Sequence, residues 1–261
     1  MEQTSGGEKL PIPTENNPHK KAWFSEVCRE HRLEITEKQL DQIEEFIILL
    51  LEWNKKVNLI SRKDEKNIWR NHILHCASIL FHLSFPHGAR IIDIGTGGGF
   101  PGIPLKILQP DLQVTLLDSI EKKVNAVKDI VKKLSIPGIL VERGRVEELV
   151  SGTDRHHQYD IAIARAVAPL KTLVSWSRPI LSNYKVYQNG LEEQKTHIKI
   201  EPPALLAMKG GNLAEELQGI QEMSGIRAVQ TIHLAQNKTT ENIINDKNVI
   251  YVSFNSRDTQ N

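Results

Sequence analysis

Cysteine is scarce in this 261-residue sequence, and long apolar runs are absent. The two cysteines, Cys28 and Cys76, form no CxxC pair and no other zinc-finger spacing, which favours a reduced, cytoplasmic compartment over a disulfide-rich secreted protein. The most apolar segment, residues 46–51, is far shorter than the roughly 18 residues of a membrane span. Residues 1–17 are polar and lack the apolar centre of a signal peptide, and we expect them to form a flexible tail.

Charge of one sign is not in excess either. The formal net charge is +1, so composition alone indicates no nucleic-acid partner, and any basic surface has to be local. The hydrophobic share of 39% is ordinary for a globular protein and is sufficient for a sizeable core. We expect a monomer with no membrane partner and no metal.

Helical patterns fill residues 18–88, which we interpret as an N-terminal helical cap. Apolar residues between Trp23 and Cys28 share one face of a first helix. Thr36 and Gln39 have the spacing of a capping box, and the helix that follows is apolar at helical intervals. A third helix is predicted over residues 65–83.

Residues 89–261 alternate strand-like and helical segments, which predicts a Rossmann-like, mostly parallel sheet. The last two strands, near 226–234 and 248–254, have no predicted helix between them and should form a hairpin with one antiparallel strand. One polar stretch, residues 182–203, is long for a connection inside such a fold. We interpret it as a surface insertion, and a substrate-facing loop is the alternative. The five preceding strands are expected at 90–94, 114–118, 139–141, 160–164 and 204–208, with helices near 103–108, 120–134, 170–181 and 213–223.

A glycine-rich turn follows the first of these strands and organises the domain. Residues 97–102 satisfy the G-x-G-x-x-G fingerprint of dinucleotide sites. A second frame is Asp93-x-Gly95-x-Gly97-x-Gly99, the form typical of S-adenosylmethionine (SAM) sites. In that frame an acidic side chain at the strand end can hold the amino-acid part of the cofactor, whereas a pyrophosphate gains nothing from Asp93.

Further candidates end the next strands. Asp118 is placed to accept hydrogen bonds from both hydroxyls of an adenosine ribose, which suits NAD and SAM equally. Val146 follows the third strand, where an adenine edge would lie. Arg165 ends the fourth strand and Lys209 the fifth, so two cations lie at the rim where transfer would occur.

Two groupings in the cap have simpler interpretations. His72, His75 and Cys76 share one helix face at a spacing that could hold metal, but no fourth ligand is evident. Cations flank the second and third helices and form either a phosphate-binding face or a solvated one; we favour phosphate binding. They are Lys55, Lys56, Arg62, Lys63, Lys66 and Arg70.

Several motifs together resemble the bacterial RsmG (GidB) methyltransferases. They are residues 53–59 (WNKKVNL), 72–74 (HIL), 92–105 (IDIGTGGGFPGIPL), 117–119 (LDS), 145–148 (RVEE), 165–168 (RAVA) and 209–210 (KG). The resemblance covers roughly residues 35–255. It implies a class I methyltransferase that uses SAM to methylate a guanine N7 in small-subunit ribosomal RNA.

The resemblance also implies roles for individual residues. It places cofactor contacts at Gly95, Phe100, Val146 and Glu147, and puts Arg165 in the shared cofactor and substrate site. The glycine frame and the strand-end argument add Asp93, Gly97, Gly99 and Asp118 to the predicted cofactor-binding set. Arg165 and Lys209 are the candidate catalytic residues, and RNA is expected to contact them together with Lys55, Lys56 and Arg62.

The sequence departs from the family pattern in two places. His75-Cys76 stands where the family usually has Asp-Ser, and the 182–203 stretch is longer than usual. Neither touches the cofactor motifs. The alternatives are an NAD-dependent oxidoreductase, a SAM methyltransferase acting on another RNA, and a nucleotide-sensing RNA-binding module without catalysis. The substrate would be ribosomal RNA, either free or within an assembling small subunit.

Overall fold

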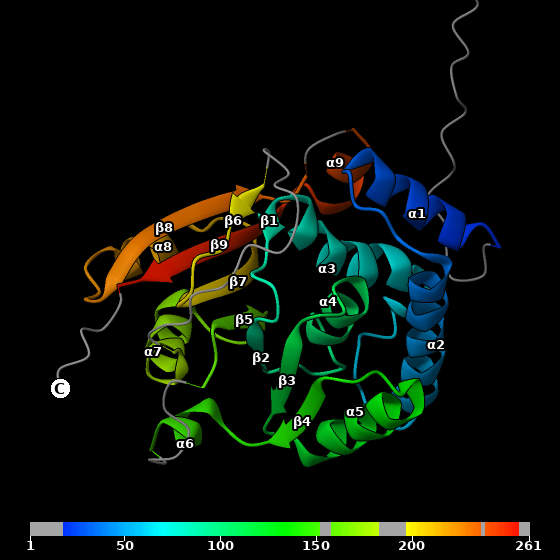
Figure 1. Cartoon of the computed structure of the whole chain (residues 1–261), viewed down its shortest axis with the longest axis horizontal. Coiled ribbons are helices and arrows are strands. Elements are labelled where there is room, and N and C mark those ends of the chain that lie inside the picture. Colours follow the sequence, from blue (N-terminus) through cyan, green and yellow to red (C-terminus); the bar gives the residue numbers. More distant parts are fainter. Residues whose placement is uncertain (1–17, 152–157, 183–196, 236–237, 256–261) are drawn as a thin grey trace, which may run out of the picture.

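A seven-stranded sheet forms the centre of the computed structural model, which describes residues 18–151, 158–182, 197–235 and 238–255 (Figure 1). The strand order is β4-β3-β2-β5-β7-β9-β8. β9 runs antiparallel to both neighbours, and all other pairs are parallel. The predicted Rossmann-like sheet with one antiparallel strand is therefore confirmed. The strands are β2 (Arg90–Ile94), β3 (Gln113–Asp118), β4 (Ile139–Arg143), β5 (Ile161–Arg165), β7 (Ala204–Gly210), β8 (Ile226–His233) and β9 (Lys247–Phe254).

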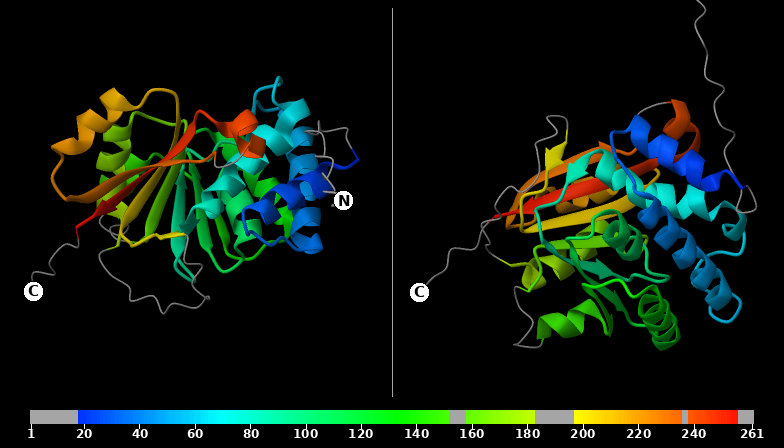
Figure 2. Two further views of the ribbon diagram at one scale, coloured as in Figure 1. Left: turned by 90° about the horizontal axis from the view of Figure 1, so that it is seen from above. Right: turned by 45° about the vertical axis from the view of Figure 1, so that its right-hand side comes forward.

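The central strands β2, β5 and β7 are mostly apolar because both faces of the sheet are covered, and their polar residues lie mainly near the strand ends. Side chains alternate between the faces, so neighbouring residues of one strand enter different cores. In β2, Ile91 packs with α4 (Gly102–Leu108) and α5 (Glu121–Leu134), whereas Ile92 packs on the opposite side. That opposite side is covered by α6 (Val146–Ser151), α7 (Leu170–Ile180) and α8 (Ala214–Gln221). Figure 2 shows the sheet between these two helical layers.

Of the N-terminal helices, α2 (Glu37–Asn54) packs outside α4 and α5, and α1 (Lys20–Glu30) lies near α9 (Lys238–Ile244) and contacts the segment Trp69–Leu74 (Figure 1). The predicted capping box is present, since the Gln39 amide donates to the Thr36 hydroxyl and the Gln39 side chain accepts from the Thr36 amide. The Gln39 side chain also donates to the carbonyls of Ile107 and Leu108, the last two residues of α4. The helices and the sheet share one apolar core.

The predicted third helix over residues 65–83 is present from Glu65 to Phe81, but it is not a regular α-helix. The segment consists of short turns of different pitch: η1 (Glu65–Asn67), the π-helical η2 (Trp69–Leu74), α3 (His75–Ala77) and η3 (Ser78–Phe81). Every residue from His72 to Phe81 is buried. Contacts on all sides, rather than a single apolar stripe, therefore decide the pitch of this segment.

The expected absence of a helix between the last two strands is also wrong. α9 (Lys238–Ile244) lies there, and its Ile244 side chain enters the core that the N-terminal helices line. Arg70 of η2 donates to the Asn242 carbonyl of α9. Tertiary packing against η2 thus stabilises a helix too short to be evident from periodicity.

A second, two-stranded sheet is an element that the sequence did not predict. β1 (Leu83–Ser84) pairs in parallel with β6 (Ile198–Lys199). β6 belongs to the predicted insertion, residues 182–203, of which 183–196 lie outside the described residues, as does the predicted tail 1–17. Leu181, just before the insertion, bridges to Tyr159 ahead of β5. Both described ends of the insertion therefore lie near the end of the main sheet where the parallel strands begin, and the glycine turn lies at the other end.

None of the helices in the described ranges is long and apolar enough to cross a bilayer. The division into a cap and a sheet domain stays a prediction, because the two parts share their core.

Gly102 sets the distance between α4 and the sheet. A Cβ atom there would lie 2.3 Å from Leu116 Cδ2 and 2.9 Å from Asp93 Oδ2. We expect Gly102→Ala to lower the free energy of unfolding by about 1–3 kcal/mol through overpacking. Gly219→Ala in α8 is the matched control, because nothing lies within 4 Å of its Cβ position and alanine favours a helix. Denaturant titration of both variants tests this, and equal stability of Gly102→Ala and the parent would contradict it.

Candidate active site

The glycine turn between β2 and α4 is closed by a buried carboxylate. Asp93 is completely buried at the end of β2, and its Oδ2 atom accepts hydrogen bonds from the Thr96 hydroxyl (2.7 Å) and the Gly102 amide (2.9 Å). Its Oδ1 atom has no hydrogen-bond partner among the described residues. Burial raises the pKa of Asp93 to about 6, while the two hydrogen bonds act in the opposite direction. Asp93 therefore holds the turn with one oxygen, while its other oxygen is buried without a partner.

Gly97 has the space that a cofactor passage needs. Its φ is +59°, and the nearest atom to a Cβ built on it would be the Gly95 carbonyl oxygen, 4.0 Å away. Gly95, with φ +67°, is crowded instead, because a Cβ there would lie 2.7 Å from a Val167 methyl group. At Gly95, both the left-handed backbone and the nearby Val167 side chain require glycine. At Gly97, the left-handed backbone favours glycine, and the space beside it is open.

Asp118 ends β3 beside this turn and connects it to α5. Its Oδ2 atom accepts from the Gly97 amide (3.0 Å), and its Oδ1 atom accepts from the Ile120 amide (2.8 Å). Each carboxylate oxygen can accept more than one hydrogen bond, so capacity remains for ligand hydroxyls. Val146 is buried at the start of α6, and Glu147 next to it is exposed. These residues come from successive strand ends, as the sequence predicted.

Phe100 faces the helical cap. Its ring lies edge-on to Phe46 of α2, with 5.2 Å between centroids, and is tilted against His72 at 4.9 Å. The guanidinium carbon of Arg165 lies 4.9 Å from the centre of the same ring. The side chain of Phe100 is thus buried against other residues, and the predicted cofactor contact at this position would use its backbone.

Arg165 ends β5 and reaches the cap. Its Nη2 atom donates to His72 Nδ1 at 3.1 Å. The next residue, Ala166, has a left-handed φ of +54°, a conformation that costs free energy in alanine and is often found at functional sites. This turn places Val167 over Gly95 and directs Arg165 toward the cap.

Lys209 is less accessible than a simple rim cation. Its ammonium donates to the Ala168 carbonyl (2.7 Å) and to Glu216 (2.8 Å), and its side chain is 12% exposed. Glu216 also accepts from the Leu170 amide at the start of α7. Lys209 and Glu216 together therefore hold the loop that follows Arg165.

The predicted RNA-binding cations lie on an exposed loop beside the glycine turn. Lys55, Lys56 and Arg62 are exposed. Asn54 fixes the loop, because its Oδ1 atom accepts from the Leu59 and Ile60 amides. A Cβ at Gly98 would lie 3.0 Å from Leu50 and 3.3 Å from Leu59, so this loop packs directly on the turn.

Three residues that organise the site were missed by sequence reasoning. Asn54 lies within the 53–59 motif, but nothing in that motif indicates that its side chain accepts from the Leu59 and Ile60 amides. Glu216 lies outside the motifs and accepts from Lys209 and the Leu170 amide. His72 is predicted only as a possible metal ligand together with His75 and Cys76. Within the described ranges, no cluster of three or more His, Cys, Asp or Glu residues is placed to hold a metal ion.

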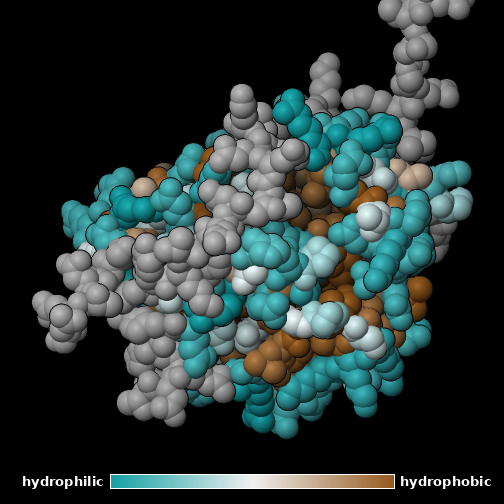
Figure 3. Space-filling view, viewed as in Figure 1, coloured by the Kyte–Doolittle hydropathy of each residue, from teal (hydrophilic) through white to brown (hydrophobic). Residues whose placement is uncertain are grey.

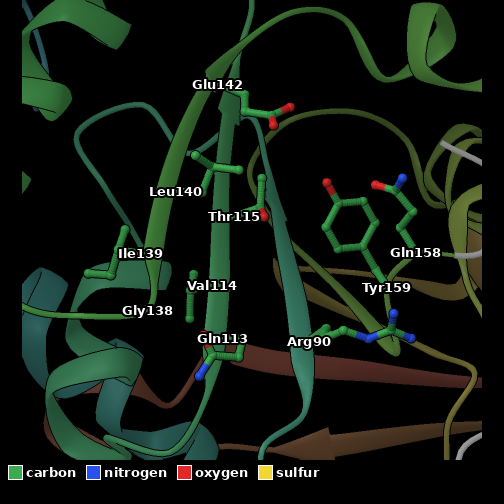
Figure 4. Close-up of a pocket in the computed structure, with 10 residues that line it drawn as sticks. All are labelled: Arg90, Gln113, Val114, Thr115, Gly138, Ile139, Leu140, Glu142, Gln158 and Tyr159. Atoms are coloured by element: carbon green, nitrogen blue, oxygen red, sulfur yellow. The ribbon is translucent and has the colours of Figure 1, made fainter. Parts of the chain in front are cut away.

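A hollow of about 540 Å³ lies elsewhere, on the exposed face of β3 and β4 (Figure 4). Its lining includes Arg90 and Gln113, the first residues of β2 and β3. It therefore extends to the end of the sheet where the strands begin, away from the glycine turn. Leu140 of β4 also lines it and is 54% exposed. Figure 3 shows a mostly hydrophilic face with apolar side chains where Figure 1 places β3 and β4. This hollow is not part of the site at the strand ends.

Known proteins resemble the chain in sequence. The family model described as rRNA small subunit methyltransferase G (GidB) matches residues 39–244. A ribosomal RNA small subunit methyltransferase G of Desulforamulus reducens is 37% identical over 64% of this chain and 70% of its own length. The protein of the same name from Bacteroides fragilis is 33% identical over 85% of this chain and 96% of its own. A crystal structure of a SAM dependent methyltransferase from Aquifex aeolicus superposes with a TM-score of 0.48 and 15% identity, covering 78% of this chain and 97% of that one.

The raised pKa of Asp93 predicts a pH dependence of stability. Asp93 has an ordinary pKa of 3.8 when the chain unfolds and about 6 in the fold, so the folded state binds more protons between these values. Its contribution to stability is complete below pH 4 and is lost as the pH rises through 6. The loss is about 3 kcal/mol for a shift of about two units.

Asp93→Asn keeps an acceptor but cannot ionise, so it provides the comparison. We expect the unfolding free energy of the parent, relative to Asp93→Asn, to decrease between pH 4 and pH 7. Urea denaturation at four pH values in this range measures it. A constant difference would show that Asp93 ionises normally in the fold.

Proposed function

The chain belongs to the rRNA small subunit methyltransferase G (GidB) family, and from that membership we propose that it transfers a methyl group from SAM to N7 of a guanine in small-subunit (16S) ribosomal RNA. The observation that carries the proposal is the open space over Gly97, whose amide donates to the Asp118 carboxylate, in a turn that the buried Asp93 carboxylate holds in place. We further propose that it works in the cytoplasm as a monomer.

The residues at the strand ends suit SAM. Asp93 places a carboxylate beneath the turn, where its negative charge favours a cationic amine nearby, and Asp118 has acceptor capacity for ribose hydroxyls. Gly97 keeps a side chain out of the passage, whereas glycine at Gly95 and Gly99 avoids clashes with Val167 and Ile103. Val146 and Glu147 lie where the adenine is expected. When bound, SAM supplies an electrophilic methyl group on a sulfonium.

The protein needs no general base for an N7 target. Guanine N7 carries an in-plane lone pair and no proton at neutral pH, so it can attack without being deprotonated. The remaining task is to align the acceptor atom with the methyl group and to exclude water. We propose that Arg165 does this by holding the guanine O6 or a phosphate, since an arginine stays protonated and presents a planar set of donors.

Lys209 was predicted to be catalytic and to bind RNA, and its contacts suggest an indirect role. We propose that it keeps the Arg165 loop in place through the Ala168 carbonyl and Glu216. A direct contact between Lys209 and RNA would have to form in addition to the hydrogen bonds with Ala168 and Glu216.

Methyl transfer tests the function. With labelled SAM, we expect label in small-subunit ribosomal RNA, at a guanine that is unmodified in cells lacking the gene. Gly97→Val should abolish SAM binding, because a branched side chain would enter the open space. Isothermal titration should show SAM binding by the parent and none of NAD.

Gly88→Val is the matched control for this variant. Gly88 has a similar φ of +68° and nothing within 4 Å of its Cβ position, but it precedes β2 at the other end of the sheet. We expect both variants to carry similar backbone strain, and only Gly97→Val to lose SAM. Tight SAM binding by Gly97→Val would contradict the assignment of this turn, and NAD binding would favour an oxidoreductase.

Salt dependence tests the proposed RNA contacts. If Lys55, Lys56 and Arg62 bind phosphates, replacing all three with glutamine should flatten the slope of log affinity against log salt by about two units, at about 0.7 for each single-strand contact. The control replaces three exposed lysines of α5, Lys128, Lys132 and Lys133, and should leave the slope unchanged. A slope that changes only in the α5 variant would place the RNA path over α5.

A further inference from the structure

His72 and Arg165 form a contact whose donor and acceptor are fixed by chemistry. A guanidinium can only donate, so the 3.1 Å contact between Arg165 Nη2 and His72 Nδ1 requires an unprotonated Nδ1. The imidazole proton then lies on Nε2, which is 3.7 Å from Asp64 Oδ2, an electrostatic contact longer than a hydrogen bond. The side-chain amide of Asn71 donates from Nδ2 to the other oxygen of Asp64 at 2.8 Å.

The surroundings keep His72 neutral. It is buried in the π-helical turn η2, and burial together with the positive charge of Arg165 lowers the pKa of His72 to about 4. The charge of Asp64 acts in the opposite direction and is the smaller influence. A neutral acceptor is therefore available to Arg165 at physiological pH.

Two contacts define the plane of the guanidinium. The guanidinium lies over the Phe100 ring, and His72 accepts a hydrogen bond at one of its edges. The glycine turn that carries Phe100 also borders the proposed cofactor passage. The described residues give Arg165 no second hydrogen bond. Its other N–H groups can therefore face a ligand.

We propose that His72 is a positioning residue for methyl transfer, which fixes the Arg165 guanidinium over Phe100 so that its free N–H groups meet the target guanine. The inference rests on the proposed function, because it assigns Arg165 to the substrate. It also gives the π turn a role, since wide turns of this kind are often found at functional sites. His72 acts through Arg165 and makes no contact with the reacting atoms.

Nitrogen-15 NMR of the imidazole tests the contact without any assay of activity. At pH 6.5 we expect the His72 signals of a neutral ring with the proton on Nε2, assigned by their loss in His72→Asn. Arg165→Met should shift the Nδ1 resonance, because the donor is removed. A charged ring, or a proton on Nδ1, would overturn the proposal.

Single-turnover methylation at saturating RNA and SAM tests the consequence. His72→Phe keeps the ring but removes the acceptor, and we expect the rate to fall about 10- to 100-fold with SAM affinity unchanged. His72→Asn places an oxygen near the Nδ1 position and should restore the rate to within about threefold of the parent. The control is His75→Phe, because His75 is also buried but has no hydrogen bond to Arg165.

The outcomes separate the two proposals. A parent enzyme that methylates no ribosomal RNA would refute the function, and the NMR result would still decide the contact. Equal slowing by His72→Phe and His75→Phe, or no rescue by asparagine, would reduce His72 to a packing residue and overturn the inference. If His72→Phe does not fold, the effect of Arg165→Met on the imidazole signals decides instead.

Discussion

The buried carboxylate of Asp93 is the contact on which the site depends. By accepting from Thr96 and Gly102 it fixes both ends of the glycine turn at once, and it does so from the end of a strand held on both sides by parallel neighbours. Asp118 then fixes the middle of the turn through the Gly97 amide. The position of each glycine follows from these two carboxylates, which are themselves set by the register of β2 and β3.

The helical cap belongs to the site as much as the sheet does. Leu59 packs against Gly98, and Phe46 packs against Phe100, so the cap touches the glycine turn at two places. Arg165 crosses from the sheet to the cap and ends on His72. A substrate bound by the cap and a cofactor bound by the turn would therefore share their supporting residues.

Much of the fold could be predicted from the sequence, because buried parallel strands are short apolar runs and a glycine turn after such a run has few other uses. The positions of Asp93, Asp118 and Arg165 at the strand ends follow from the same reasoning. The mixed helical turns around His72 could not be predicted, since burial on every side removes the periodic signal. α9 also escaped prediction, because its stability comes from contacts with η2. The engagement of Lys209 by Glu216 depends on α8 docking beside α7, which no local pattern encodes.

The shared core has a consequence for the order of folding during synthesis. The buried face of α2, with Leu40, Ile43 and Ile47, joins the same core as residues of α4 and α5. Those helices leave the ribosome up to about 80 residues later, which at about 5–20 residues per second is on the order of 4–16 s. During that interval α2 lacks the two helices that it contacts most, so part of its apolar face stays uncovered. The packing of the N-terminal helices, which are synthesised first, is therefore complete only after the sheet and its helices have formed.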